Sequence, residues 1–325
     1  MIEFLDPINV KVKKLLNRLT EARAANLDNC DSPISDCAQA ADPRFNHLDL
    51  HVSQSLAVLK VAEFSSSASF TVPSNVYLIM VEMLIGGGGG GGGGSGGAGI
   101  YSSDRRGSGG GGGGGAEAII GYPIPVHPGD TVHVVIGGGG HGGAGGDPYA
   151  DGASGSFGGS SYVVIDGVTI VGALGGAPGG GGTYEGSGHA PGGPSRYYSD
   201  VDLTVPGKAG GRGGNGEATL DYSASNGDSM LVPYLGGGRG APHTGMAGGG
   251  GGASLRGRGG DGGDGASDAD GKAADPGQAG QGPGAGGGGG GAGTKSDTSA
   301  YRYGKAGGDG HDGYALISFL GANDG

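Results

Sequence analysis

The chain has 325 residues with 88 glycines, no tryptophan and a formal net charge of −12. So acidic a chain disfavours nucleic acid and anionic lipid as main partners, because both are bound by basic surfaces. The glycines follow no sustained Gly-X-Y repeat, which argues against collagen, and all of them lie after Ile85. The sequence therefore divides into a glycine-free and a glycine-rich segment, and we predict domains at 1–64 and 65–325.

The first domain, residues 1–64, is predicted to be a helical attachment and trimerisation stalk. Two groups of apolar residues recur at helical spacing, and each would form a stripe on a short helix. The stripes consist of Val12, Leu15, Leu16, Leu19 and Ala22, and of Leu48, Val52, Leu56 and Leu59. Neither stripe is large enough to fold as a globular unit, so we expect self-association, most simply as a parallel homotrimer.

Four side chains of this stalk invite a chemical interpretation. His47 and His51 are four residues apart and would share a helix face, so in a trimer they could surround an axial metal or anion. Solvated or packed histidines are the simpler interpretation, and we expect no metal. Cys30 and Cys37 are too few for a disulfide framework. Free thiols and an interchain bond are both left open, although a cytoplasmic site of assembly would keep the thiols reduced.

Export and membrane signals are not predicted. Residues 1–6 lack the basic region and the apolar core of a signal peptide. The longest apolar run, 75–85, contains Glu82 and is too short to span a bilayer. We therefore expect the protein to meet a cell surface by a route other than a signal sequence.

The glycine-rich domain contains several segments that predict β-strands. Two pairs of them flank strong turn signals, Pro128-Gly129-Asp130 and Asp166-Gly167. The predicted strands lie at 75–85, 116–124, 131–136, 161–165, 168–171 and 314–320. Because the first precedes the glycine blocks and the last follows them, the region is expected to open and close with β structure, as one folded domain would.

Glycine blocks interrupt these strands, at 86–94, 109–115, 137–140, 248–252 and 286–291. One interpretation is a flexible linker, because ordering glycine costs the most backbone entropy. The other is a set of polyglycine II helices, whose backbone groups would pair with neighbouring helices. The intervening strands favour the second. The predicted fold class is thus mostly β and irregular: a short helical trimeric stalk, then small β-structure combined with packed polyglycine II helices.

The longer connections between glycine blocks carry most of the tyrosines. Tyrosine beside serine, glycine and arginine is typical of recognition loops, because its ring offers a large rigid surface with a polar tip. The alternative is that these rings merely cover a lattice poor in other apolar groups. We predict the following receptor-contact residues: Tyr101, Arg105, Arg106, Tyr149, Tyr197, Tyr198, Tyr301 and Tyr303.

Two stretches resemble phage proteins. Residues 19–35, LTEARAANLDNCDSPIS, are similar to an LT-x-x-RA-x-x-LD-x-LD-x-x-IS pattern of phage tail fibre and tail tip proteins, departing at Cys30. The segments that begin at Phe70, Val126 and Gly307 resemble the glycine-rich domain that ends many tail fibres, and the polyglycine-helix adhesins of T-even-like phages. The resemblance implies a virion receptor-binding protein for host attachment, made in bacterial cytoplasm, whose partners are tail proteins and a bacterial surface protein or glycan.

Catalytic and other interpretations find less support. A nucleophile elbow with a histidine partner, a P-loop and a His-Glu-x-x-His motif are all missing from the sequence, so we expect neither an enzyme nor a cofactor. An acidic group, Asp261, Asp264, Asp268 and Asp270, lacks the spacing of a calcium loop. The main alternative is a structural tail component that does not bind cells. An ice-binding or cell-wall protein and a glycan hydrolase are further alternatives.

Overall fold

A computed structural model of the protein describes residues 58–97, 107–184, 190–194, 204–213, 224–229, 235–240, 246–267, 271–294 and 303–321. These residues belong to one compact unit, Val58–Gly321. The predicted stalk, with His47, His51, Cys30 and Cys37, lies outside the described residues apart from its last segment, 58–64.

The regular secondary structure of the described residues is β-strand, with no α-helix among them. Five strands form one antiparallel sheet in the order β1-β9-β3-β4-β8, and four form a second in the order β2-β5-β6-β7. The strands are β1 (Val58–Phe64), β2 (Ala68–Thr71), β3 (Leu78–Ile85), β4 (Ala118–Pro125), β5 (Thr131–Val135), β6 (Ser161–Ile165), β7 (Val168–Ala173), β8 (Thr204–Val205) and β9 (Tyr314–Gly321).

The predicted strands are confirmed as β3, β4, β5, β6, β7 and β9. Asp166 and Gly167 form the turn between β6 and β7, both with positive φ (51° and 78°), as a two-residue hairpin requires. Leu59 differs from its prediction: it lies in β1 opposite Leu320 of β9, and not in a helical stripe. The physical reason is that every residue of Val58–Phe64 pairs with the last strand, β9. A short isolated helix would have no such partner.

The two sheets share one hydrophobic core. Alternate residues of β3 point into it, so that Ile79 and Val81 are fully buried, and Ile317 of β9 lies beside them. Val132 of β5 and Val163 of β6 supply the opposite side. This alternation of inward and outward residues is what a period-two strand pattern produces when one face is covered.

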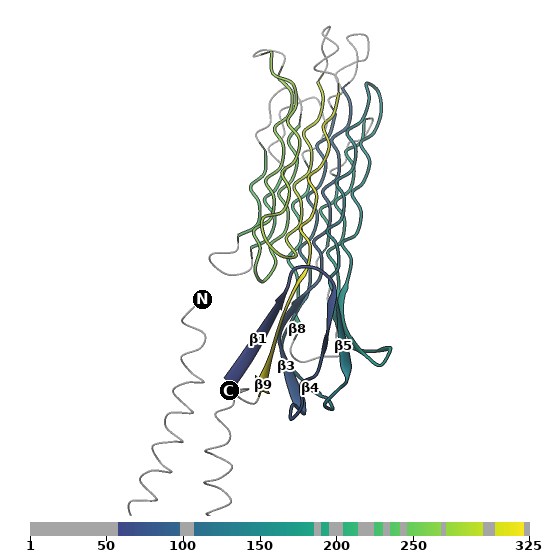
Figure 1. Ribbon diagram of the computed structural model, residues 1–325. Coiled ribbons are helices and arrows are strands. Elements are labelled where there is room, and N and C mark those ends of the chain that lie inside the picture. Colours follow the sequence, from purple (N-terminus) through teal and green to yellow (C-terminus); the bar gives the residue numbers. More distant parts are fainter. Residues whose placement is uncertain are drawn as a thin grey trace, which may run out of the picture. The chain divides into compact units, whose positions relative to one another are not determined.

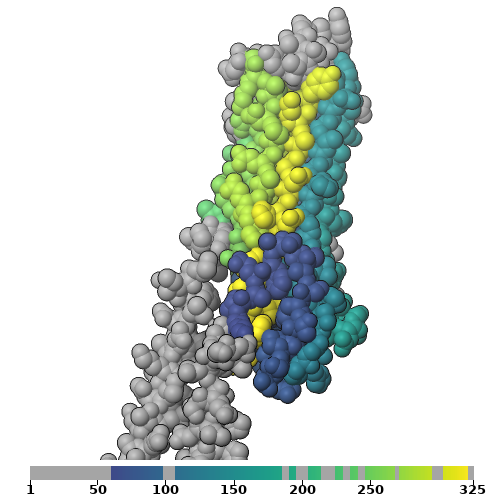
Figure 2. All heavy atoms as spheres, viewed as in Figure 1, coloured from purple at the N-terminus to yellow at the C-terminus, as the bar shows by residue number. Residues whose placement is uncertain are grey.

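Glycine segments run from the sheets in alternating directions and form a bundle (Figure 1). We call the end beside the strands the sheet end. The opposite end, called the far end, is defined by Gly97, Gly107, Gly146, Thr294 and Tyr303. Contacts join these residues: Gly97 lies against Thr294, Gly107 lies against Ser95, and Gly304 donates to the carbonyl of Gly146 (2.9 Å). In Figure 2 segment 303–313, in yellow, runs along the bundle between teal and green neighbours.

Backbone hydrogen bonds between glycine segments repeat every three residues. Gly89 and Gly92 donate to the carbonyls of Gly114 and Gly111 (2.9 and 2.8 Å), whereas the residues between them donate to two other segments. Three residues per turn is the repeat of a polyproline-II-type helix, which has no internal hydrogen bonds. Each segment is therefore held by its neighbours alone.

Segment 86–97 is surrounded by other glycine segments. It donates to 107–117, 150–160 and 303–313, and it accepts from 137–149, 174–184 and 284–294. All its residues are buried. A Cβ atom on Gly90 would overlap the carbonyl oxygen of His141, so only glycine fits where the chains approach this closely.

Segment 137–146 lies at the surface of the bundle. Its exposed residues are Gly138, His141 and Ala144, three apart, while Gly140 and Gly143 between them are buried. A Cβ atom on Gly138 would meet nothing closer than Asp312 Oδ1, at 3.8 Å. Side chains are therefore accommodated at every third position of an outer segment.

Candidate functional site

Several of the predicted contact residues belong to connections whose described flanking residues lie at the far end. Connection 98–106, with Tyr101, Arg105 and Arg106, starts after Gly97 and ends before Gly107. The described residues that flank 295–302, which contains Tyr301, are Thr294 and Tyr303. All four flanking residues lie at the far end. The candidate residues of these two connections are themselves outside the described residues.

Tyr149 is held in an unusual backbone conformation at this end. It sits in a turn closed by a hydrogen bond from Ala150 N–H to Asp147 C=O (2.9 Å), and its own φ is +65°. A bulky residue at positive φ is uncommon and strained. The backbone N–H of Tyr149 donates to the Gly97 carbonyl (3.3 Å), and the side chain is about half exposed. Backbone hydrogen bonds thus fix the main chain at Tyr149, while its side chain faces solvent.

Tyr184 forms an edge-to-face pair with Tyr149, with ring centroids 5.6 Å apart. Its backbone N–H donates to Asp151 Oδ1 (2.6 Å), the first residue after the Tyr149 turn. Sequence reasoning did not select Tyr184. Segments 137–146 and 174–184 both run parallel to segment 86–97 and donate hydrogen bonds to it, which brings their ends together. The position of Tyr184 just after its glycine segment is therefore the signal that could have identified it.

Tyr303 is 43% exposed and begins the segment that follows connection 295–302. The next residue, Gly304, donates to Gly146, which precedes the Tyr149 turn. We call Tyr149, Tyr184 and Tyr303, with the exposed carboxylates of Asp147 and Asp151, the far-end cluster. It combines aromatic surface with hydrogen-bond acceptors on segments that the lattice holds rigidly.

Tyr197 and Tyr198 belong to a connection with different flanks. Residues 195–203 are outside the described residues, but Pro194 lies beside Gly114 and Thr204 pairs with Ile119 of β4. Both flanks are at the sheet end. The predicted contact residues therefore fall into two groups, one attached to each end of the bundle.

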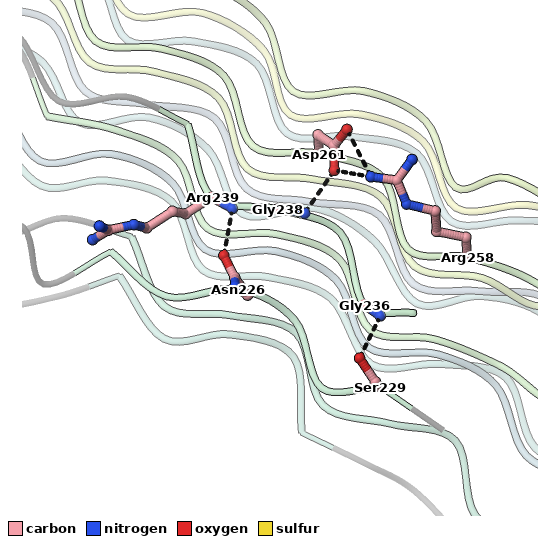
Figure 3. Close-up of polar contacts among 7 residues, drawn as sticks. All are labelled: Asn226, Ser229, Gly236, Gly238, Arg239, Arg258 and Asp261. Atoms are coloured by element: carbon pink, nitrogen blue, oxygen red, sulfur yellow. Dashed lines mark hydrogen bonds and ion pairs between the residues drawn. The ribbon is translucent and has the colours of Figure 1, made fainter. Parts of the chain in front are cut away.

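Other polar side chains complete the edge of the lattice (Figure 3). Where no neighbouring segment supplies a carbonyl, a side-chain oxygen accepts the backbone hydrogen bond. Asp261 Oδ1 accepts from Gly238 N–H (2.6 Å), Asn226 Oδ1 from Arg239 N–H (2.9 Å), and Ser229 Oγ from Gly236 N–H (3.0 Å). These side chains have a structural role, since each satisfies a donor that would otherwise depend on water.

The acidic group considered for calcium is engaged in ion pairs where it is described. Arg258 Nη2 lies 2.8 Å from Asp261 Oδ1, and Lys272 Nζ lies 2.9 Å from Asp264 Oδ2 and 2.8 Å from Asp275 Oδ2. Hydrogen bonds to Asp275 and Asp264 raise the pKa of Lys272. Within the described ranges no three His, Cys, Asp or Glu side chains gather as they would to bind a metal ion.

Among the described residues, Tyr314 also has a shifted pKa. Burial raises the pKa of its hydroxyl, and so does the hydrogen bond that this hydroxyl donates to Glu63 Oε1 (2.8 Å). Arg256 lies over the ring, 4.4 Å from its centroid. Tyr314 thus joins Arg256, at the sheet end of the bundle, to Glu63 of β1, which is a packing role.

Comparison with known proteins agrees with this architecture. Residues 63–320 match the family described as Glycine-rich domain. The chain belongs to that family. No curated protein matches it. In the part of the glycine-rich domain that the structure describes, no helix is long and apolar enough to cross a membrane.

Proposed function

We propose that this glycine-rich domain protein is a phage tail fibre or tail tip adhesin, which attaches the virion to a bacterial surface protein or glycan. The contact surface is the far-end cluster together with the connections 98–106 and 295–302. The observation that carries the proposal is the Tyr149–Tyr184 pair, in which the half-exposed ring of Tyr149 stands on a strained turn at the far end of the bundle. Binding involves no covalent chemistry and no cofactor.

The scaffold suits such a role. Packed polyglycine II segments hold one another through backbone hydrogen bonds, so the connections between them can vary in sequence without changing the lattice. Aromatic rings presented from fixed backbone lose little conformational entropy on binding, which is why tyrosine is enriched at recognition surfaces. A strained conformation persists when its surroundings hold it, and here Tyr149 N–H donates to Gly97 while Ala150 N–H donates to Asp147 and closes the turn.

The remaining parts of the proposal rest on sequence. The resemblance of residues 19–35 to phage tail proteins supports the phage assignment and a place in the virion. The apolar stripe formed by Val12, Leu15, Leu16, Leu19 and Ala22 supports a homotrimeric stalk that joins other tail proteins. The formal net charge of −12 supports a partner other than nucleic acid.

Cell binding by the labelled full-length protein tests the proposal. On a panel of bacterial strains, saturable binding to some of them is expected. Tyr149→Gly with Tyr184→Ala should then weaken binding by about tenfold or more, because buried aromatic anchors carry most interface energy. Glycine is chosen at 149 because it adopts positive φ without strain.

The matched control is Tyr77→Ala, since Tyr77 is an exposed tyrosine (64%) near the strands. It should leave binding unchanged. Equal loss in both variants, or none in the double variant, would remove the far-end cluster from the site. Folded protein that binds no strain would favour the alternative, a structural tail component.

A further inference from the structure

The outward face of the five-stranded sheet carries large apolar side chains in solvent. Val61 of β1, Leu78 of β3 and Leu320 of β9 are each half exposed or more. The register places them together, because Ser318 lies opposite both Val61 and Met80, and Leu78 lies opposite Pro125. We call this the open face, consisting of Val61, Leu78, Met80, Pro123, Pro125 and Leu320.

The same strands are also apolar on their inward face, where Ile79, Val81 and Ile317 are buried. Strands that are apolar on both faces are typical of sheets covered on both sides. Antiparallel sheets with one wet face instead alternate apolar and polar residues. The sequence of β3, LIMVEMLI, is apolar at every position except Glu82. This pattern is typical of a strand in a sheet that is covered on both faces.

The protein covers half of this outward face with its own chain. Nearer the bundle, Leu255 packs on a cluster that includes Ile85, Ala118 and Tyr314, and Arg256 lies over the Tyr314 ring. Farther from the bundle, at the open face, none of the described residues provides a comparable cover. The difference between the two halves marks the open face as an interaction surface.

The chain outside the described unit joins it beside this surface. Residues 1–57 lead directly into Val58, the first residue of β1, and the next residue, Leu59, lies opposite Leu320. Among the described strands β1 pairs only with β9, so it is an edge of the sheet. Copies of the chain that associate through residues 1–57 would therefore hold their open faces within reach of one another.

The distribution of charge also favours a second copy of the chain as the partner of the open face. Copies with a formal net charge of −12 repel one another over most of their surface. None of the six side chains of the open face is charged. The adjoining carboxylates on the same side of the sheet, Glu82 and Glu63, accept hydrogen bonds from Ser318 Oγ and the Tyr314 hydroxyl of their own chain, so the apolar patch itself offers two copies a contact without a charged side chain. We propose that the open face is a contact between copies of this chain, in addition to any contact between their stalks. The proposal does not rest on the adhesin function.

Cysteine crosslinking of the full-length chain tests this contact. In a Cys30→Ser, Cys37→Ser background, Leu320→Cys is compared with Val168→Cys on β7 of the other sheet. Both positions are 61% exposed and both share any tether through the stalk. With a short bifunctional maleimide, Leu320→Cys should form covalent oligomers at least about tenfold faster, because a contact raises the effective concentration toward the millimolar range. Equal rates at the two positions would overturn the proposal.

A second variant separates a contact from mere proximity. Leu78→Lys adds a charge to the open face at a position that is half exposed in the single chain, so each copy should keep its fold, as checked by circular dichroism. In the Leu320→Cys protein it should reduce crosslinking to the rate of Val168→Cys. Unchanged fast crosslinking would mean that the open face is not the contact and that the copies are held together elsewhere.

Discussion

Segments 86–97 and 137–146 have similar compositions but different surroundings. The first exchanges hydrogen bonds with neighbours on all sides, and the second has one side in water. The glycine requirement thus follows from the number of close neighbours, since a polyproline-II-type helix alone accepts side chains. The longest glycine blocks, 86–94, 109–115, 286–291 and 248–252, lie in fully buried segments, whereas His141 and Ala144 continue the shorter block 137–140 at the surface.

The largest test of this difference places one methyl group in each segment. Gly90→Ala should abolish folding or cost more than about 3 kcal/mol, because the new Cβ overlaps the backbone of segment 137–146 and a packed interior relaxes little. Gly138→Ala should leave stability unchanged or slightly higher. Calorimetry measures the stability of both variants against that of the unmodified protein. Similar losses at the two positions would break the comparison.

A smaller effect is expected where the buried lattice meets the sheets. The side chain of Glu117 is fully buried, and its Oε2 accepts the Leu174 backbone N–H (2.8 Å). Glu117→Leu should cost about 1–3 kcal/mol, because that donor would be left unsatisfied away from water. Glu117→Gln keeps an acceptor and should cost less. Denaturant unfolding of the pair measures the difference, and equal losses would show that the hydrogen bond is unimportant.

The smallest effect should appear at an outer segment. Asp309 Oδ1 accepts from Gly142 N–H (2.7 Å), and its side chain is 62% exposed. In Asp309→Ala, water can replace the acceptor, so we expect a loss of about 0.5–1 kcal/mol at most. Hydrogen exchange at Gly142 should nevertheless become faster. Asp309→Asn retains an acceptor oxygen and serves as the control, with exchange close to that of the unmodified protein.

Sequence reasoning predicted the strands better than the lattice, for a physical reason. Side chains alternate along β3 and β9 and so reveal their faces, and Asp166-Gly167 specifies its own turn. A glycine segment has no side chains to distinguish one neighbour from another, so its partners could not be predicted. The length of each block was the one readable signal, because it reports how completely the segment is surrounded.

The candidate site was predicted in part for the same reason. Tyr149 was chosen by composition, and the structure gives it a fixed backbone and an aromatic partner. Tyr184 was not chosen, because its proximity to Tyr149 depends on which glycine segments are neighbours. The residues that flank Tyr197 and Tyr198 lie at the sheet end, which also depends on which glycine segments are neighbours. The role of these two tyrosines in binding stays a prediction.

The repeat of three along each glycine segment also constrains how such a protein can change over generations. Inserting one residue within segment 86–97 would rotate every later residue by a third of a turn and aim its N–H at the wrong neighbour. Adding or removing three residues in every segment together would keep the phase and change only the length of the bundle. Far-end connections carry no such rule, so lineages are free to alter them in any increment while the bundle between them lengthens or shortens in triplets.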